Sequence, residues 1–383
     1  MKKVVITNTL GYLQLRNFAG LPFKKYKIRK RHDLYKILFW GAKRFYGTTN
    51  KYWLNLYYDL DLYKGDLCHF FNTLSRGRRP WITSFSSCIP RFGKVPYHFA
   101  KFGVELLVRD QCKKIIAISK NAKLVQEKFI GAEFPKYEEK ILSKLCIVHP
   151  TQKLNIKKYC QKKIGCDTIS FTVVGKEFFR KGGMEILRVL NDVNKQKNKI
   201  KLNIISSIKY GDYATKSTEQ DYKKALFIIK ENYSWINHFD FLPNNMVLEI
   251  LKNSHVALLP SYDDSYGYSV LEAQSNGCPV ITTDIRALTE INNNDIGWLI
   301  KVPKNCYNYS EINSREKRST YSKIIENNLF KIISEILFDP TVIYKKGIKC
   351  IDNIVKFHNP KTAVYKLEGI YDSILEKREI SSP

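Results

Sequence analysis

Short apolar, β-branched segments alternate with longer segments of helical periodicity along the whole chain, and this alternation is the strongest constraint on its fold. One series of apolar segments runs from Val4 to His149 and a second from Ile169 to Ile300, with a polar stretch between them. Strands with little internal alternation that are separated by helices indicate parallel sheets covered on both faces. We therefore predict an α/β protein with two doubly wound, Rossmann-like domains.

The expected strands follow directly from these apolar segments. They are Val4–Thr7, Leu67–Phe71, Trp81–Phe85, Ile115–Ile118, Cys146–His149, Ile169–Val174, Leu202–Ile205, His238–Phe241, Val256–Leu259, Val280–Thr283 and Trp298–Ile300. A chain of 383 residues usually exceeds what one hydrophobic core supports. We place a first domain at residues 1–155 and a second at 156–360, and we expect a C-terminal helix at about residues 361–383 to pack back on the first domain.

The charge balance indicates anionic partners. Lys and Arg number 64 against 36 Asp and Glu, which leaves a formal net charge of +28. Such a charge favours nucleic acid, an anionic membrane surface or phosphorylated small molecules. The nine Cys residues are scattered without a C-x-x-C pair, which is typical of reduced thiols in the cytoplasm and indicates no metal site. No run of about 18 apolar residues occurs, so no membrane-spanning helix is expected.

The densest basic segment spans residues 23–47. A helix within it would carry an apolar face made of Leu34, Ile37, Leu38 and Trp40. Its other face would be basic, with Lys36, Lys43 and Arg44. One interpretation is an interfacial patch that docks on anionic lipid. The alternative is an ordinary first-domain helix whose apolar face belongs to the core and whose lysines are solvated.

A first informative loop lies in "FTVVGKEFFRKGG", residues 171–183. A buried strand leads into Gly175 and Lys176, and Lys181 and Gly182 stand before a helix. Lysine charges and the free N–H groups of a helix N-terminus are suited to a diphosphate. The order of a Walker loop is absent. The alternative is that these are surface lysines of a lysine-rich chain.

A second loop, "DSYGYSVLE", places Asp264 and Glu272 on either side of Gly267. The glycine permits close approach to a ligand, and a helix expected from about Ser269 points its N–H groups at the same place. Two carboxylates could then reach different parts of one ligand, and carboxylate oxygens suit a vicinal diol. The alternatives are a capping box formed by Ser269 and Glu272 and a solvated turn carboxylate at Asp264.

The segment Pro260–Ile291 resembles the signature of the family 4 glycosyltransferases. The E-x7-E pair of that family falls on Asp264 and Glu272. Its G-R-x4-K-G loop falls on four positions about 80 residues upstream, namely Gly175, Lys176, Lys181 and Gly182. The resemblance implies the GT-B fold, in which two Rossmann-like domains face each other across a cleft, with the nucleotide sugar on the second domain and the acceptor on the first.

The resemblance also implies a role for each matching residue. Lys176 and Lys181 would neutralise the leaving diphosphate, Glu272 would hold the ribose, and Asp264 would contact the transferred sugar. The backbone that lines the sugar and phosphates would belong to Tyr266, Gly267, Tyr268 and Ser269, beside Gly175 and Gly182. It further implies retention of the anomeric configuration, no metal and no cofactor besides the nucleoside-diphosphate sugar donor, with UDP and GDP as the nucleotides to consider.

Four departures from the family pattern stand out. Asp264 is one methylene shorter than the usual Glu, and Lys176 replaces an Arg that could form a bidentate fork. Arg286-Ala287 replaces a Gly-Gly pair, and Phe85-Ser86 stands where many members have a histidine. We place the base pocket near Asp240–Met246, since that segment follows a second-domain strand.

The sequence thus predicts a retaining glycosyltransferase of the cytoplasm, peripheral to the inner membrane face, that acts on a glycan or lipid-linked acceptor in polysaccharide or glycoconjugate biosynthesis. One alternative is a GT-B relative that does not transfer, such as a sugar-nucleotide epimerase, which would release an epimer or free nucleotide without an acceptor. Another is a basic nucleic-acid-binding protein, although no recognised nucleic-acid motif occurs and diffuse charge gives only salt-sensitive binding.

Overall fold

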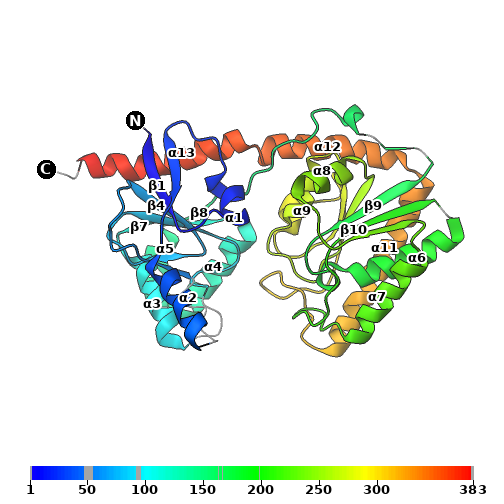
Figure 1. Ribbon diagram of the computed structural model, residues 1–383, viewed down its shortest axis with the longest axis horizontal. Coiled ribbons are helices and arrows are strands. Elements are labelled where there is room, and N and C mark those ends of the chain that lie inside the picture. The colour runs from blue at the N-terminus through cyan, green and yellow to red at the C-terminus, as the bar shows by residue number, and fades with distance from the viewer. Residues whose placement is uncertain are drawn as a thin grey trace. The chain divides into compact units, whose positions relative to one another are not determined.

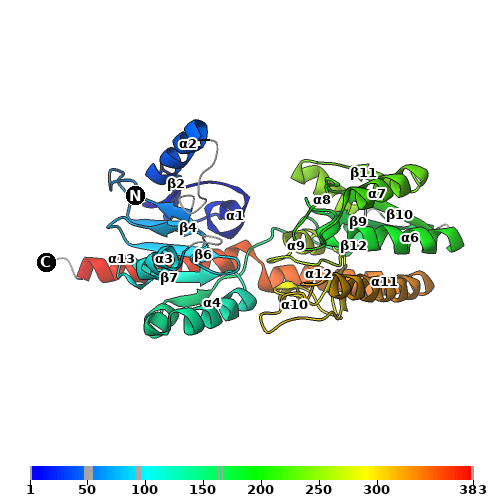
Figure 2. The ribbon, with the colours of Figure 1, turned by 90° about the horizontal axis from the view of Figure 1, so that it is seen from below.

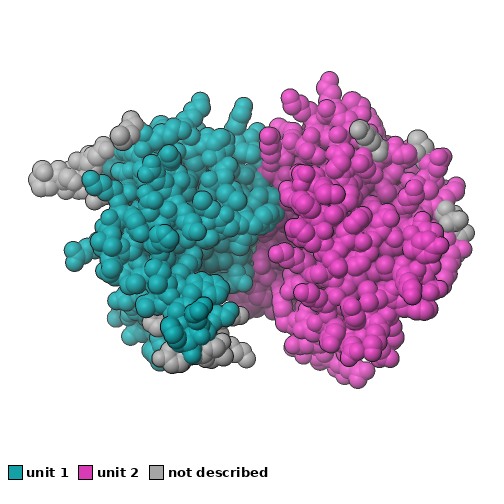
Figure 3. Space-filling model, viewed as in Figure 1, with its two compact units in different colours: residues 1–151, 358–383 teal, residues 152–357 magenta. Residues whose placement is uncertain are grey.

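The chain forms two compact units in the computed structural model, which describes residues 2–46, 55–91, 96–162, 164–165, 167–197 and 199–380. Unit 1 comprises residues 1–151 and 358–383, and unit 2 comprises residues 152–357 (Figure 3). The C-terminal segment therefore groups with the N-terminal unit, and the chain passes between the units after Thr151 and again after Phe357.

Unit 2 is built around a six-stranded sheet in which every neighbouring pair is parallel. Its strands are β9 (Ile169–Val174), β10 (Ile200–Ile205), β11 (Ile236–Phe239), β12 (Val256–Leu259), β13 (Val280–Thr283) and β14 (Trp298–Ile300). They lie in the order β11-β10-β9-β12-β13-β14, so the direction of winding reverses between β9 and β12. Ligands of such sheets bind beyond the carboxyl ends of the strands at this reversal.

Helices cover both faces of the unit 2 sheet (Figures 1 and 2). One face carries α6 (Gly183–Lys197), α7 (Glu219–Glu231) and α11 (Arg315–Phe338). The other elements of the unit are α8 (Asn244–Lys252), α9 (Tyr268–Gln274), α10 (Leu288–Ile291) and α12 (Thr341–Phe357). Two of these helices have an N-cap whose hydroxyl oxygen accepts a hydrogen bond from a backbone N–H of the first turn: Thr218 for α7 and Ser314 for α11. The strands lie covered on both sides, which explains why they read as continuous apolar segments.

Unit 1 contains a second six-stranded parallel sheet in the order β2-β1-β4-β6-β7-β8. Its strands are β1 (Lys3–Thr7), β2 (Tyr26–Lys30), β4 (Leu67–Phe71), β6 (Trp81–Phe85), β7 (Cys112–Ala117) and β8 (Leu145–Ile147). A small separate pair is formed by β3 (Leu56–Tyr57) and β5 (Leu74–Ser75). The helices are α1 (Tyr12–Gln14), α2 (Leu34–Tyr46), α3 (Tyr97–Val108), α4 (Lys120–Glu133), α5 (Glu138–Leu142) and α13 (Pro360–Ile380).

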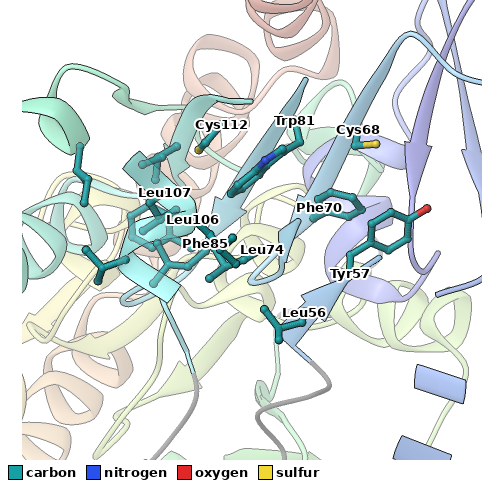
Figure 4. Packing of buried hydrophobic residues seen from close by; sticks show 14 of the residues in the cluster. Leu56, Tyr57, Cys68, Phe70, Leu74, Trp81, Phe85, Leu106, Leu107 and Cys112 are labelled. Atoms are coloured by element: carbon teal, nitrogen blue, oxygen red, sulfur yellow. The ribbon is translucent and has the colours of Figure 1, made fainter. Parts of the chain in front are cut away.

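The core of unit 1 gathers large side chains from strands and helices, as Figure 4 shows. Trp81, Phe70 and Phe85 are fully buried in it, and Leu107 of α3 packs against them. The C-terminal helix α13 joins this unit through Tyr371, whose hydroxyl lies 2.7 Å from Nδ1 of the buried His69. The α/β architecture with parallel sheets predicted from the sequence is therefore confirmed.

In the basic segment 23–47, the side of the helix that is buried differs from the prediction. The last residue of the segment, Gly47, lies outside the described residues. The segment contains the edge strand β2 as well as helix α2. The buried side chains of α2 are Tyr35 and Phe39. Of the predicted apolar face, Leu34 is half-buried, whereas Ile37, Leu38 and Trp40 are exposed by 59%, 54% and 58%. The alternative in which that face belongs to the core is therefore wrong. None of the described helices is long and apolar enough to cross a membrane.

Candidate functional site

The two loops singled out from the sequence follow the two strands at which the unit 2 sheet reverses. β9 and β12 pair in parallel, with Phe171 opposite Val256 and Val173 opposite Leu258. The loop after β9 and the loop after β12 therefore leave the same edge of the sheet side by side. Tyr262 N donates to the carbonyl oxygen of Arg180 over 2.9 Å and ties the two loops together.

An ion pair between Lys181 and Asp264 joins these loops. Both side chains are largely buried, with exposed fractions of 10% and 14%. The other carboxylate oxygen of Asp264, Oδ1, accepts hydrogen bonds from Tyr266 N (3.0 Å) and Gly267 N (2.8 Å). Burial opposes ionisation of Asp264, but the Lys181 ammonium, the N–H group of Tyr266 and the Arg180 guanidinium hold its pKa below the usual value. Asp264 is therefore no solvated turn carboxylate.

Two glycines allow this close approach of the loops. Gly182 has φ of +77°, and a Cβ added there would lie 2.3 Å from the carbonyl oxygen of Pro260. Gly267 has φ of +88°, and its Cβ would lie 2.6 Å from Leu288. L-residues with a side chain rarely adopt such backbone conformations. Glycine at these two positions is thus required by the backbone itself.

The carboxylate of Glu272 does not cap its own helix. Helix α9 begins at Tyr268 with Gly267 as N-cap, and no side chain caps it. Ser269 therefore lies inside the first turn, and the predicted capping box is absent. Glu272 is only 5% exposed, and its Oε1 accepts a hydrogen bond from Asn244 Nδ2 at 3.1 Å. The capping alternative for Glu272 is wrong.

That contact brings in the segment in which we expected the base pocket. Asn244 is the first residue of α8, within Asp240–Met246. Its contact with Glu272 links the start of α8, which follows β11, to helix α9. Phe241 in the same segment is 75% exposed, and Asp240 is 3.6 Å from Nε2 of His238. The predicted ribose carboxylate and the predicted base segment therefore lie next to each other.

The remaining predicted residues surround the ion pair less closely. Lys176 is exposed, and its carbonyl oxygen accepts a hydrogen bond from Ser207 (2.9 Å). Gly175 is directly beside the side chain of Lys181, since a Cβ there would lie 3.2 Å from its Cε. Tyr266 is buried, and its ring centroid is 5.4 Å from that of Tyr268.

A third carboxylate, Asp263, lies at the centre of this region and was not predicted to belong to the site. Its Oδ1 is 2.7 Å from Nη1 of Arg286, and its other carboxylate oxygen accepts from the hydroxyl of Tyr213. Its carbonyl oxygen accepts from Arg180. The signal in the sequence was indirect, because Asp263 neighbours Asp264 and Arg286 is one of the departures from the family pattern.

The site combines buried carboxylates with ammonium and guanidinium groups at the sheet edge, an arrangement that can bind a ligand with both phosphates and hydroxyls. Within the described part of the chain, no group of three or more His, Cys, Asp or Glu residues could hold a metal ion.

Comparisons with known proteins agree with this geometry. Residues 161–315 match the family model of the Glycosyl transferases group 1, and this range includes both loops and Glu272. No curated protein matches the chain.

Three solved structures share the fold of the whole chain. HepE from Anabaena, solved in complex with UDP, is 12% identical, with a TM-score of 0.62 over 97% of this chain and 100% of that one. Sucrose-phosphate synthase from Thermosynechococcus elongatus is 11% identical, with a TM-score of 0.61 over 98% and 100%. A glycosyltransferase from Rickettsia africae is 13% identical, with a TM-score of 0.59 over 98% and 90%. These structures confirm the predicted GT-B fold class, and the match to the glycosyltransferase family model confirms the predicted enzyme class.

Proposed function

We propose that this glycosyltransferase transfers a sugar from a nucleoside diphosphate to a glycan or a lipid-linked acceptor, with retention of configuration, in the manner of family 4. The observation that carries the proposal is the ion pair of Lys181 and Asp264 at the reversal point of the unit 2 sheet. Next to it, the N-terminus of α9 and the buried Glu272 offer partners for phosphate and for a ribose diol.

Each group then has a chemical task. Lys181, with Lys176 at the loop start, neutralises the diphosphate, and Glu272 accepts hydrogen bonds from the ribose hydroxyls while Asn244 holds its carboxylate in place. Oδ1 of Asp264 is engaged by its own loop and Oδ2 by Lys181, so Oδ2 becomes available to the transferred sugar when Lys181 turns to the diphosphate. A bound diphosphate competes with Asp264 for the ammonium group of Lys181.

The transfer itself needs no enzymic nucleophile. The bond between the anomeric carbon and the phosphate oxygen breaks, and the acceptor hydroxyl forms the new bond on the same face of the sugar. The proton of that hydroxyl passes to the departing phosphate oxygen, so that the products are the glycoside and a nucleoside diphosphate. The cations and N–H groups around the diphosphate stabilise the charge that develops on it.

The first nucleotide to consider is UDP. HepE from Anabaena was solved with UDP and with UDP-glucose, and its fold matches 97% of this chain. Nucleotide choice depends on the loop after β11, where Asn244 contacts Glu272. A uridine donor is therefore the specific form of the proposal.

The acceptor is brought to the enzyme at a membrane surface, in the cytoplasm on the inner membrane face. Helix α2 follows the edge strand β2 in the chain and lies at the margin of unit 1, as Figure 2 shows. It exposes Trp40 and Phe45, the latter by 80%, and Lys43 Nζ lies 5.1 Å from the ring centroid of Trp40. Exposed aromatic and aliphatic side chains beside cations are suited to the interface of an anionic bilayer.

Calorimetry and thermal stabilisation against UDP, GDP, ADP, CMP and their sugars test the donor assignment. A ligand at 100 times its dissociation constant stabilises the folded protein by about 2.7 kcal/mol. We expect a clear response to UDP and UDP-sugars. Absence of any response at several millimolar would contradict the proposal. Conversion of a UDP-sugar to an epimer without acceptor would instead identify an epimerase.

A further inference from the structure

Arg286 occupies a backbone conformation that normally belongs to glycine. Its φ is +46°, in the left-handed region, and it stands where the resembled family has a Gly-Gly pair. A residue with a side chain in this region costs on the order of 1 kcal/mol, and such strain persists only where the surroundings impose it. Here Arg286 N donates to the carbonyl oxygen of Asn308 over 2.9 Å. The position thus combines a backbone conformation typical of glycine with a guanidinium group.

That guanidinium group is buried and directed at Asp263. Arg286 is 7% exposed, and Nη1 lies 2.7 Å from Asp263 Oδ1. Its Cζ also lies 4.5 Å from the ring centroid of Tyr309. Burying a charge pair is unfavourable unless its geometry is well satisfied. The arrangement therefore stabilises one specific position of Asp263.

Asp263 in turn connects the loops after four strands of the unit 2 sheet. Arg286 reaches it from the loop after β13, and Tyr213 donates its hydroxyl from the loop after β10. Arg180, from the loop after β9, donates to the carbonyl oxygen of Asp263, and Asp263 itself belongs to the loop after β12. All four loops leave the carboxyl edge of one parallel sheet.

The two residues that flank this network are the ion pair of the proposed donor site. Asp263 directly precedes Asp264, and Arg180 directly precedes Lys181. We propose that Arg286 is a positioning residue for donor binding: by holding Asp263, it sets the place of the Lys181 and Asp264 side chains that meet the diphosphate and the sugar. This inference rests on the proposed function and adds a residue that the family pattern does not supply.

A double-mutant cycle on Arg286→Gly and Asp263→Asn tests this inference. Glycine keeps the left-handed backbone without strain, so the substitution removes the buried side chain with its contacts to Asp263 and Tyr309 and leaves the loop backbone unchanged. Asparagine keeps the shape of Asp263 without its charge. The readouts are the dissociation constant for UDP by calorimetry and the melting temperature of the protein without ligand.

We expect each single variant to bind UDP about tenfold more weakly, and the double variant to bind no worse than the weaker single one, because the two side chains act as a unit. The charge-neutral double variant should melt close to the wild type. A matched control is Arg188→Gln, which breaks another ion pair of unit 2, to Glu326 at 2.7 Å, and should leave UDP affinity unchanged.

The outcomes separate the inference from the proposed function. Unchanged UDP affinity in the Arg286→Gly variant would overturn the positioning role while leaving the donor site intact. A lower melting temperature of a single variant with unchanged UDP affinity would also overturn the positioning role, because the contacts of Asp263 would then only stabilise the fold. A wild-type protein that binds no nucleotide would overturn the proposed function and this inference with it.

Discussion

The ammonium group of Lys181 lies against the carboxylate of Asp264, although 83 positions separate the two residues in the chain. The contact exists because β9 and β12 are neighbours in the sheet, and the loops that follow them meet at one edge. Neither side chain is more than about one-seventh exposed. The pair therefore stabilises the loops and at the same time presents the charges that a diphosphate would engage.

Removal of one partner should separate these two roles. Lys181→Ala leaves a largely buried carboxylate without its cation, and we expect a loss of about 3 kcal/mol in the free energy of unfolding. Adding Asp264→Asn should recover much of that stability, because no charge is then left unpaired. UDP affinity should be at least about tenfold lower than that of the wild type in both the single and the double variant, because both lack the Lys181 ammonium group. Thermal melts and calorimetry on both proteins measure this, and full UDP affinity in the double variant would contradict the diphosphate role.

The same ion pair predicts that the stability of the protein decreases at acid pH. The pKa of Asp264 lies below that of an unfolded carboxyl group. Its contribution is therefore present above the unfolded pKa and is lost as the pH falls through the folded pKa, below about 4. The melting temperature of Asp264→Asn should fall less than that of the wild type over this acid range. Parallel curves for the two proteins would show that the ion pair contributes nothing.

Glu272→Gln tests the ribose assignment. Gln keeps the carbonyl oxygen that Asn244 contacts, so the melting temperature should change little. A neutral amide accepts more weakly from the ribose diol, and we expect UDP affinity to fall about tenfold. The sharper measurement compares UDP with 2′-deoxy-UDP. The wild type should discriminate between them and the variant should do so much less. Equal discrimination by both would remove Glu272 from the ribose site.

Helix α2 predicts a membrane-binding phenotype. The variant Leu38→Ser with Trp40→Ser removes two exposed apolar side chains and should leave the fold intact. We expect the wild type to sediment with phosphatidylglycerol vesicles at low salt, and the variant to sediment severalfold less. Phe338→Ser is a matched control, since Phe338 is 89% exposed on α11 of unit 2. Equal losses in both variants would mean that exposed apolar area alone explains the binding.

Asp33, just before α2, predicts a second pH dependence of opposite sign. It is 3% exposed, and burial raises its pKa to about 6 in spite of the nearby Lys36 ammonium and the N–H groups of Tyr35 and Tyr58. A raised folded pKa gives stability that is present at low pH and is lost as the pH rises from about 4 to about 6.

Asp33→Asn should remove that decline. Asn keeps the hydrogen bond from Tyr35 N (3.0 Å) and is equally good before a helix. The gain in the free energy of unfolding at neutral pH is about 3 kcal/mol at most. Melting temperatures of both proteins between pH 4 and pH 7 measure it. A variant that still declines over this range would assign the effect to another group.

Most strands were predictable because they are buried on both faces. Each expected segment contains or overlaps a strand. Six were predicted with their observed bounds: Leu67–Phe71, Trp81–Phe85, Ile169–Val174, Val256–Leu259, Val280–Thr283 and Trp298–Ile300. The edge strand β2, Tyr26–Lys30, escaped prediction. Its sequence YKIRK leaves mostly basic side chains exposed, and such a segment lacks the continuous apolar character that marked the others.

Three further features could not be predicted from the local sequence pattern, because they depend on contacts formed in the folded chain. The buried side of α2 is defined by Tyr35 and Phe39, because the strands beside it and not the helical periodicity decide which face packs inward. Ser269 fits a capping-box pattern, but the helix starts one residue earlier, after the left-handed Gly267. The role of Asp263 follows from partners that are 23 and 50 positions away, Arg286 and Tyr213.

The sequence by itself determined the two α/β series, the loops with glycine and charge at their strand ends, and the carboxylates around Gly267. These features are local, since a buried strand, a turn glycine and a helix start each depend on a few neighbouring residues. Only the tertiary structure decided which charges meet, namely Lys181 with Asp264, Asn244 with Glu272 and Arg286 with Asp263. The physical reason is the strand order: it brings loops that are distant in the chain to one edge of the sheet, and pairing of buried charges then fixes their positions.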